Sequence, residues 1–159
     1  MIQFSDFEEK TKIIFKDKNL IKQAFIHRSY INENPNIGLS HNERLEFLGD
    51  AVVELVVTDF LYKKYKDYDE GELTALRSAL VNAVIISDVA STLGMNDFLL
   101  LSKGEAKDTG KARQYILANT YEAYVGAVYL DQGYDVSKDF ITSSLLIHTE
   151  EIVKKKLWR

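Results

Sequence analysis

The sequence predicts an all-α protein, folded as a single helical domain of six to eight helices. Apolar residues recur with helical spacing along almost the whole chain of 159 residues. Glycines, one proline and residues that favour helix N-termini separate these stretches. No internal repeat and no linker divides the sequence, so we treat residues 1–159 as one domain. A globule of this length buries roughly 70% of its unfolded surface, which is enough for one hydrophobic core.

Three helices are expected in the first half of the chain, and each begins at a residue that favours a helix N-terminus. Ser5-Asp6-Phe7-Glu8 and Ser40-His41-Asn42-Glu43 both fit a capping box, in which the serine and glutamate side chains each bond the other residue's backbone N–H. Asn19 is the expected cap of the helix between them. The helix from Ser5 should end near residue 15, the helix from Asn19 near residue 30, and the helix from Ser40 near residue 65. Residues 31–39, which hold the only proline, should form a loop.

The long helix that opens at Ser40 contains a segment with an alternative interpretation. Val52-Val53-Glu54-Leu55-Val56-Val57 is rich in β-branched residues, which are typical of a buried strand. We favour the helix, because apolar residues at positions 45, 48, 52, 55 and 56 continue one helical stripe across the segment.

The second half of the chain predicts a turn at residues 67–71 and three further helices. They are expected over residues 72–93, over residues 114–131, and from a cap at Asp135 to the lysine-rich end. Gly94 is placed to end the first of these helices in a left-handed conformation, and Gly133 is placed to end the second. Lys154-Lys155-Lys156 suits the C-terminus of the last helix, where the helix dipole favours cations.

Composition excludes several classes of protein. There is no cysteine, so disulfide frameworks, thiolate zinc sites and cysteine nucleophiles are ruled out. No apolar run approaches the roughly 18 residues of a membrane span, and the N-terminus lacks the features of a signal peptide. We therefore expect a soluble, cytoplasmic protein with no membrane partner, and nothing in the sequence suggests an organic cofactor.

The overall charge argues against a nucleic-acid partner, because phosphate binding needs local positive charge. The chain has 20 basic and 24 acidic residues, a formal net charge of −4. A whole-chain charge can nevertheless hide a basic patch, and the segment 103–113 carries four basic residues. The end of the chain, with Lys154–Lys156 and Arg159, is a second basic stretch. On charge alone, both are interpreted as solvated segments.

Acidic residues on the helix that opens at Ser40 suggest a metal site. Glu43, Glu46 and Asp50 fall within a sector of about 60° on one helix face, where like charges repel. A divalent cation such as Mg²⁺ or Mn²⁺ would offset this repulsion. The alternative is that Glu43 completes the capping box and the others are ordinary surface acids.

Two glycines and a second pair of oxygen-bearing side chains favour the metal site. Gly49 lies between Glu46 and Asp50, and a mid-helix glycine costs about 1 kcal/mol unless another backbone or a bulky ligand must come close. Gly126 raises the same question in a later helix, where Asn119 and Glu122 share one face. Two packed helices that each present an oxygen pair are the minimum for a metal site between them.

Three segments resemble the ribonuclease III family of double-stranded-RNA endonucleases. His41-Asn42-Glu43-Arg44-Leu45-Glu46-Phe47-Leu48-Gly49-Asp50 is similar to the family signature. Ile116-Leu117-Ala118-Asn119-Thr120-Tyr121-Glu122-Ala123, continuing to Tyr129-Leu130-Asp131-Gln132-Gly133, resembles its second acidic motif. Ala24-Phe25-Ile26-His27-Arg28-Ser29-Tyr30 is similar to its early helix. The resemblance covers nearly the whole chain and implies the all-α nuclease domain of the bacterial class with a single nuclease domain.

The resemblance also implies roles for individual residues. The family's metal-binding positions fall on Glu46, Asp50, Asn119 and Glu122, and we regard Asp50 and Glu122 as the catalytic residues. The remaining matches are Glu43, an acid near the substrate and the dimer interface; Glu70, an acid at the rim of the catalytic valley; and Phe47, an aromatic that inserts into a socket on the other subunit.

The activity implied is divalent-metal-dependent hydrolysis of double-stranded RNA by a symmetric homodimer, for RNA processing. Ribosomal precursor RNA and messenger RNA are both possible substrates. Mg²⁺ is the expected cofactor, with Mn²⁺ as a substitute. Attack of a metal-activated water on phosphorus, with the 3′-oxygen leaving, gives 5′-phosphate and 3′-hydroxyl ends. His27, His41 and His148 are each isolated in the sequence and are expected to be structural.

The chain departs from the family pattern in two ways. Asn119 stands where the family has aspartate, so we expect weaker metal binding; the alternative is a catalytically weak or inactive module that dimerises or binds double-stranded RNA. Members of this class usually continue into a double-stranded-RNA-binding domain, which we expect to be absent after Arg159, either naturally or by truncation. Phosphate contacts must then come from basic residues of the nuclease domain, namely Lys103, Lys107, Lys111 and Arg113. We therefore expect cleavage only at low ionic strength or with Mn²⁺.

Overall fold

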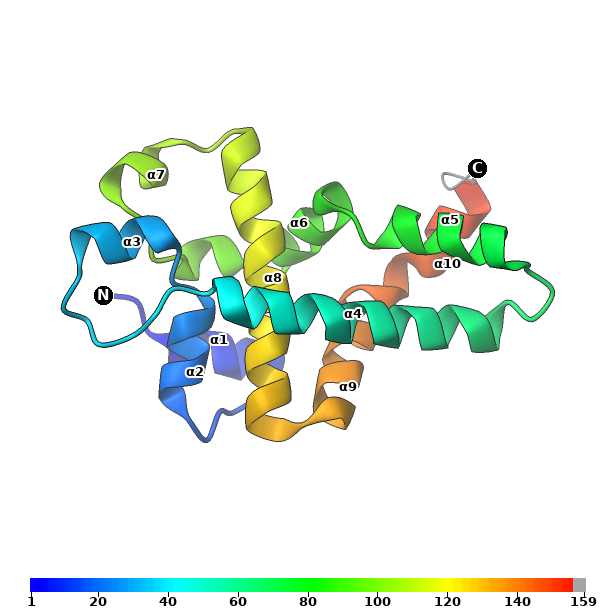
Figure 1. The fold of residues 1–159 in the computed structure, drawn as a ribbon, viewed down its shortest axis with the longest axis horizontal. Helices are drawn as coiled ribbons and strands as arrows, with labels where there is room; N and C mark the ends of the chain where they lie inside the picture. The colour runs from blue at the N-terminus through cyan, green and yellow to red at the C-terminus, as the bar shows by residue number, and fades with distance from the viewer. Residues whose placement is uncertain (156–159) are drawn as a thin grey trace.

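The computed structural model describes residues 1–155, and the regular elements in this part of the chain are all helical (Figure 1). Residues 1–155 form ten α-helices: α1 (Phe4–Thr11), α2 (Lys18–Ala24), α3 (Arg28–Glu33), α4 (Glu43–Lys64), α5 (Glu70–Leu80), α6 (Ala83–Thr92), α7 (Lys103–Lys107), α8 (Lys111–Gln132), α9 (Tyr134–Ser144) and α10 (Thr149–Lys155). Two short 3₁₀ helices are also present, η1 (Met95–Phe98) and η2 (Leu146–His148). The prediction of an all-α fold is confirmed. Lys156 and Arg159 of the expected basic end lie outside the described residues.

The central element is α8, which is buried along most of its length. It packs most extensively against α4 and also contacts α6, α9 and α2. Figure 1 shows α8 crossing the N-terminal half of α4, while the C-terminal half of α4 runs on beside α5. In the core, Tyr124 of α8 contacts the rings of Phe7, Phe25 and Phe140, with ring centroids between 5.0 and 6.3 Å apart.

The described residues contain more helices than the predicted six to eight, because three predicted helices are divided and the basic segment adds α7. The helix expected over residues 19–30 is split into α2 and α3, where Phe25 and His27 form backbone hydrogen bonds to Leu100. The helix expected over residues 72–93 is split at Asn82, whose side chain accepts a hydrogen bond from Ile85 and caps α6. The last predicted helix is divided into α9, η2 and α10. A break costs little where bridges or caps satisfy the exposed backbone groups.

Neither predicted capping box forms. Ser5 lies inside α1, whose N-cap is Gln3. Asn42, and not Ser40, is the N-cap of α4, and its side chain makes no capping bond. The Asn42 amide instead donates to the backbone oxygen of Ala24 at 2.9 Å, which ties the start of α4 to the end of α2. Glu43 is therefore not used as a capping-box acid, which removes one argument for its structural role.

Other predicted helix boundaries are close to the observed ones. Asp17 takes the capping role expected of Asn19, and α1 ends four residues earlier than expected. Gly94 has a φ of 80° and a ψ of 17°, the left-handed conformation predicted there for a residue that ends a helix. Gly133 ends α8 as predicted, with a φ of 89° and an extended ψ of −175°. Gly133 also serves as the N-cap of α9, so Asp135 lies inside the first turn rather than before it.

The helices of residues 1–155 are individually too short or too polar to span a membrane. Only α5 and α6 taken together, with a 45° bend between them, meet the length and composition requirement.

Candidate active site

The helices α4 and α8 cross at two glycines, one on each helix. A Cβ atom at Gly49 would overlap the backbone oxygen of Glu122, and a Cβ atom at Gly126 would overlap the backbone oxygen of Leu45. The sequence predicts a close approach at Gly49 by a backbone or a ligand, and the structure identifies the backbone of α8. Because neither helix carries a side chain at the contact, acids next to the glycines are brought together.

Asp50 and Glu122 form an acid pair at this crossing. Asp50 is exposed, whereas Glu122 is only 9% exposed. Burial, a hydrogen bond to Asp50 and the charges of Asp50, Glu46 and Glu54 together raise the pKa of Glu122 to about 9. A pKa this high keeps the carboxyl group of Glu122 largely protonated at neutral pH, next to the side chain of Asp50. Acids from two separate stretches of the chain are thus in contact.

The acid pair continues a row of acids along α4. Glu46 lies one turn before Asp50, and its pKa is raised by burial and then by the charges of Glu43 and Asp50. Glu54 lies one turn after Asp50, and its carboxylate is 3.9 Å from Nε of Arg77. Within residues 1–155, neither Glu46 nor Asp50 has a Lys or Arg partner within 4.0 Å. The middle of the row therefore carries negative charge that no protein cation pairs with directly.

A cavity of about 250 Å³ lies beside this row, between α3, α4 and α8. Glu43 and Glu46 of α4 line it from one side, and Asn119 of α8 lines it from another. Arg28, the first residue of α3, also faces it. The four expected metal-binding residues are thus found as two neighbouring groups. Asp50 and Glu122 are in contact, and Glu46 and Asn119 share the adjoining cavity.

The donor set was tested for its fit to a divalent cation. Within the described part of the chain, no three histidine, cysteine or acidic side chains are arranged together as metal ligands. Mg²⁺, however, usually binds through one or two carboxylates and completes its shell with water and substrate phosphates. The hard oxygens of Asp50 and Glu122 suit that mode. A divalent cation would also relieve the repulsion that contributes to the raised pKa values of Glu46 and Glu122.

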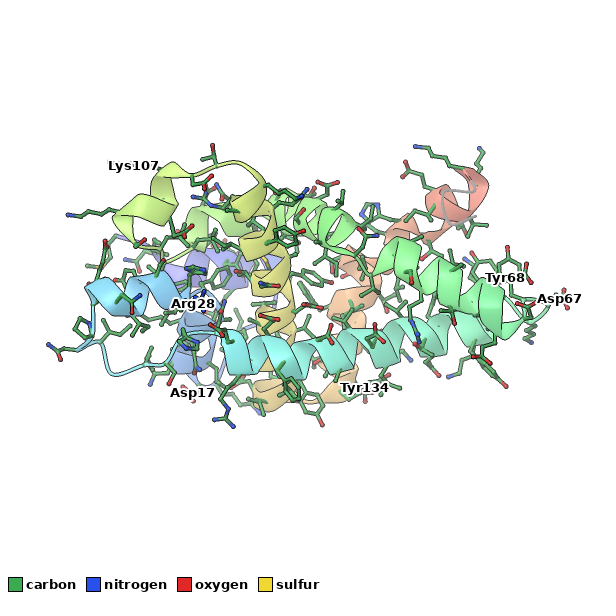
Figure 2. All side chains as sticks on the ribbon, turned by 45° about the horizontal axis from the view of Figure 1, so that its top comes forward. Asp17, Arg28, Asp67, Tyr68, Lys107 and Tyr134 are labelled. Carbon is green, nitrogen blue, oxygen red and sulfur yellow. The ribbon has the colours of Figure 1, made fainter. Side chains whose placement is uncertain are left out.

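Glu70 does not join these acids within one copy of the chain. It is the first residue of α5 and follows the C-terminal end of α4, whereas Glu46 lies in the first turn of α4. The 22 residues of α4 span about 33 Å. Figure 2 accordingly shows Asp67 and Tyr68, which precede Glu70, at the opposite end of the molecule from Arg28. A shared role with Glu46 requires Glu70 to come from a second copy.

Phe47 projects into solvent from the same helix. Its side chain is 81% exposed, although it lies between the buried residues Leu45 and Gly49. Leu55 and Tyr62, further along α4, are also exposed large hydrophobic residues. At 100° per residue the three fall within a sector of about 80°, so α4 has an exposed hydrophobic stripe. We use this name for Phe47, Leu55 and Tyr62 below.

The four expected RNA-contacting residues are not equivalent. Lys103 and Lys107 are exposed on α7, and Lys111 is exposed at the start of α8. Arg113 is only 8% exposed, and its guanidinium donates to Oδ1 of Asn96 and to the last carbonyls of α7. The buried Arg113 side chain therefore stabilises α7. It is not counted among the candidate RNA-contacting residues, which are Lys103, Lys107 and Lys111.

Two further residues of the family-like segments have structural roles. His27 caps α3 by accepting a hydrogen bond from the backbone of Ser29, and burial lowers its pKa. Asp131 accepts hydrogen bonds from the backbone N–H groups of Lys16 and Asp17, both at 2.9 Å. It thereby fastens the segment before α2 to the end of α8. The role of Asp131 has no signal in the sequence, because it depends on a contact between segments more than 100 residues apart. The His27 cap, in contrast, is a local contact with a residue two positions along the chain.

Comparisons with known proteins agree with this description. Residues 17–149 match the family described as Ribonuclease-III-like. A protein named Ribonuclease 3 from Oceanobacillus iheyensis is 50% identical over 134 residues, which are 84% of this chain and 59% of that protein. Another, from Bacillus velezensis, is 45% identical over 139 residues, which are 87% of this chain and 56% of that protein. The chain thus spans somewhat more than half the length of these relatives.

Solved structures show the same fold. The nuclease domain of ribonuclease III from Campylobacter jejuni superposes with a TM-score of 0.81 at 37% identity, covering 90% of this chain and 96% of that one. Its description reports structural flexibility in the region involved in dimer formation of that domain. Dicer from Pichia stipitis matches with a TM-score of 0.63 at 29% identity, covering 91% of this chain and 60% of that one. The nuclease-domain fold expected from the sequence is therefore confirmed.

Proposed function

This chain belongs to the ribonuclease III family, and from that membership we propose that it is a divalent-metal-dependent endonuclease that hydrolyses double-stranded RNA. The contact between Asp50 of α4 and Glu122 of α8 carries the proposal. Family membership alone does not require that the acids meet, whereas a hydrolytic site does. The proposed products carry 5′-phosphate and 3′-hydroxyl ends, and the proposed setting is RNA processing in the cytoplasm.

We assign the cation-binding role to Glu46, Asp50, Asn119 and Glu122. When bound there, Mg²⁺ or Mn²⁺ would supply an activated water and neutralise charge on the phosphate. The chain's own contribution is to orient the ligands. The glycine crossing fixes Asp50 against Glu122, and burial of Glu122 keeps water from competing for its carboxyl group. Glu122 must release its proton when it binds a cation, so metal binding should be coupled to proton release.

We further propose that the active form is a symmetric homodimer paired through the exposed hydrophobic stripe of α4. In an antiparallel pairing of two α4 helices with the twofold axis at Leu55, Phe47 of one copy lies opposite Tyr62 of the other. Tyr62 lines a cavity of about 370 Å³ between α4 and α5, which suits insertion of an aromatic ring. Glu70 lines the same cavity, so this pairing brings Glu70 of one copy towards Glu43 of the other.

The proposal is tested by incubating labelled duplex RNA with the protein and Mg²⁺ at low salt. We expect cleavage that EDTA abolishes, and a loss of at least about a hundredfold in rate for Glu122→Gln. Glu9→Gln is the matched control, because Glu9 is an exposed acid on α1, outside the site. Equal activity of Glu122→Gln and Glu9→Gln would contradict the assignment.

A second candidate function is supported by Asn119. The Asn119 side chain lines the same cavity as Glu46 but carries no negative charge. The second candidate is therefore a catalytically weak or inactive module that dimerises or binds double-stranded RNA. Asn119→Asp separates the two functions. If the chain is a nuclease, this variant cleaves at a lower Mg²⁺ concentration than the parent. If neither the parent nor Asn119→Asp cleaves but both bind duplex RNA, the binding module is the correct assignment.

A further inference from the structure

The cavity beside the acid row has a second cavity of about 440 Å³ next to it, between α3 and α8. The two have Arg28, His27, Ile116 and Asn119 in common, so they adjoin, and we call the pair the α3–α8 groove. One end of the groove meets Glu43 and Glu46. The other end is lined by residues that include Tyr115 of α8 and Glu105 of α7. The groove therefore leads from the proposed cleavage site towards the basic segment.

Within residues 1–155, Arg28 is the only Lys or Arg side chain that lines either cavity of this groove. It is exposed, and within residues 1–155 it forms no ion pair, although Glu43, Glu46 and Glu105 line the same groove. His27, its neighbour, does not add a second charge at neutral pH, because burial lowers its pKa. The groove thus holds one permanent cation that no carboxylate of the described chain neutralises.

The position of Arg28 does not favour the stability of its own helix. It is the first residue of α3, and helix N-termini favour acidic rather than basic side chains. Removing its charge should therefore leave the fold intact. A cation in such a position, beside acids but unpaired with them, is available for an anion from outside.

We propose that Arg28 binds a backbone phosphate of the RNA strand next to the scissile phosphate, and that the α3–α8 groove carries that strand. The inference rests on the proposed function and adds a substrate-positioning residue to it. The planar guanidinium binds two phosphate oxygens at once, which sets the register of the strand against the acids. The side chains of Asn32 and Tyr115 line the same groove and can hydrogen-bond ribose 2′-hydroxyl groups.

The packing of α7 extends this path. The backbone N–H of Lys103 donates to the carboxylate of Glu33 at 3.1 Å, and that of Ser102 donates to Oγ of Ser29 at 2.9 Å. α7 is therefore fastened to α3, which begins at Arg28. Figure 1 shows these two short helices next to each other, and Figure 2 shows Lys107 at the outer edge of the same side. Arg28 and the α7 lysines are thus placed to follow one phosphate backbone away from the acids.

The test measures the binding of labelled duplex RNA in a Glu122→Gln background, which prevents turnover, at salt concentrations from about 50 to 200 mM. Adding Arg28→Gln should weaken affinity about tenfold and reduce the slope of log K against log salt by about 0.7 to 0.9, the loss of one phosphate contact. Arg28→Lys should retain most of the slope, because it keeps the charge. Arg44→Gln is the matched control, since Arg44 is an exposed cation of α4 that lines neither cavity.

The outcomes separate this inference from the proposed function. The phosphate contact is refuted if Arg28→Gln and Arg44→Gln change the affinity and the salt slope equally. It is also refuted if Arg28→Lys loses as much of the salt slope as Arg28→Gln. In both cases the assignment as a nuclease is unaffected, provided that the parent cleaves. If the Arg28 effects appear as expected but the parent does not cleave, only the nuclease assignment fails. Failure of the parent to bind duplex RNA contradicts both. Thermal unfolding of all variants should be unchanged, and a lower melting temperature for Arg28→Gln alone would indicate a structural role instead.

Discussion

Gly49 and Gly126 allow the two longest helices to meet at backbone distance. Each would place a Cβ atom into a carbonyl oxygen of the other helix, and a backbone carbonyl cannot move aside as a flexible side chain can. The cost of about 1 kcal/mol for each mid-helix glycine is therefore offset by the packing of α4 against α8. The same contact positions Glu122, whose own carbonyl faces Gly49, beside Asp50.

Gly49→Ala should consequently destabilise the protein and inactivate it together. The methyl group would force α8 away from α4, and overpacking of this kind costs about 1–3 kcal/mol even after the gain in helix propensity. Urea denaturation should show a lower free energy of unfolding. Any folded fraction should cleave duplex RNA more slowly, because the distance between Asp50 and Glu122 grows.

Gly71→Ala provides the comparison for that prediction. Gly71 lies in the first turn of α5, where a Cβ atom would meet only a side-chain oxygen of Asp69 at 3.4 Å. We expect the free energy of unfolding to stay the same or to rise by up to about 1 kcal/mol. Equal destabilisation by both substitutions would show that Gly49 is not a special point of contact.

At the scale of elements, the sequence predicts the long helices well and the short ones poorly. α4 and α8 lie within about three residues of their predicted bounds, because sustained periodicity outweighs local signals. Ser40 fails as a cap because the N-cap of α4 is Asn42, whose side-chain amide donates to the backbone oxygen of Ala24 and whose backbone N–H donates to that of Ile26. A capping box does form between Asp69 and Glu72, where no distant segment competes for those groups. Local patterns therefore succeed where tertiary contacts are absent.

Asp131, at the end of α8, holds the segment before α2 through a distant contact. Burial raises the pKa of the Asp131 carboxyl, but hydrogen bonds from the backbone N–H groups of Lys16 and Asp17 outweigh burial and lower this pKa below its ordinary value. The carboxylate thus stabilises the fold above its ordinary pKa of about 3.8, and this contribution is lost as pH falls through the lower folded value. Asp131→Asn should cost at most about 1 kcal/mol at neutral pH, because solvent screens this largely exposed carboxylate, and it should cost less at pH 3, as measured by urea denaturation.

The matched variant for Asp131 is Asp135→Asn. Asp135 is exposed in the first turn of α9, four residues further along the chain. Its substitution should change the free energy of unfolding by less than about 0.5 kcal/mol at either pH. A similar loss in both variants would attribute the effect to net charge rather than to the hydrogen bonds of Asp131.

At the scale of the whole molecule, the candidate site could be assembled from the sequence only in part. The spacing of Glu46 and Asp50 and the helical face of Glu122 are local properties, so the pattern identifies them. Arg113 was expected at the surface because basic residues usually are, yet it is buried against α7. The unpaired state of Arg28 depends on three helices that meet around it. Burial and ion pairing are properties of the assembled fold, which explains why the sequence predicts the wrong role for Arg113 and does not single out Arg28.

Charge at the scale of the molecule should make activity strongly dependent on salt. With a net charge of −4, the proposed binding of RNA must rely on a few cations, and Lys103, Lys107 and Lys111 are exposed lysines close to Arg28 and the groove. Each phosphate contact contributes about 0.7 to 0.9 to the slope of log K against log salt. Lys103→Gln with Lys107→Gln should therefore lower the slope by about 1.5. Substituting Lys12 and Lys16, exposed cations near the other end of α8, should leave it unchanged.

Whether Glu70 serves the other subunit can be decided by mixing two inactive variants. In the antiparallel pairing proposed above, each site uses Glu122 of one copy and Glu70 of the other. A heterodimer of Glu122→Gln and Glu70→Gln then carries both substitutions in one site and neither in the second. Statistical mixing makes half of the dimers heterodimers, so about a quarter of the sites should be intact. If Glu70 instead acts in its own copy, every site in the mixture is impaired, and cleavage of duplex RNA stays at the level of the separate variants. Phe47→Ala in both partners should abolish the recovery, because the restored site exists only while the two copies are paired.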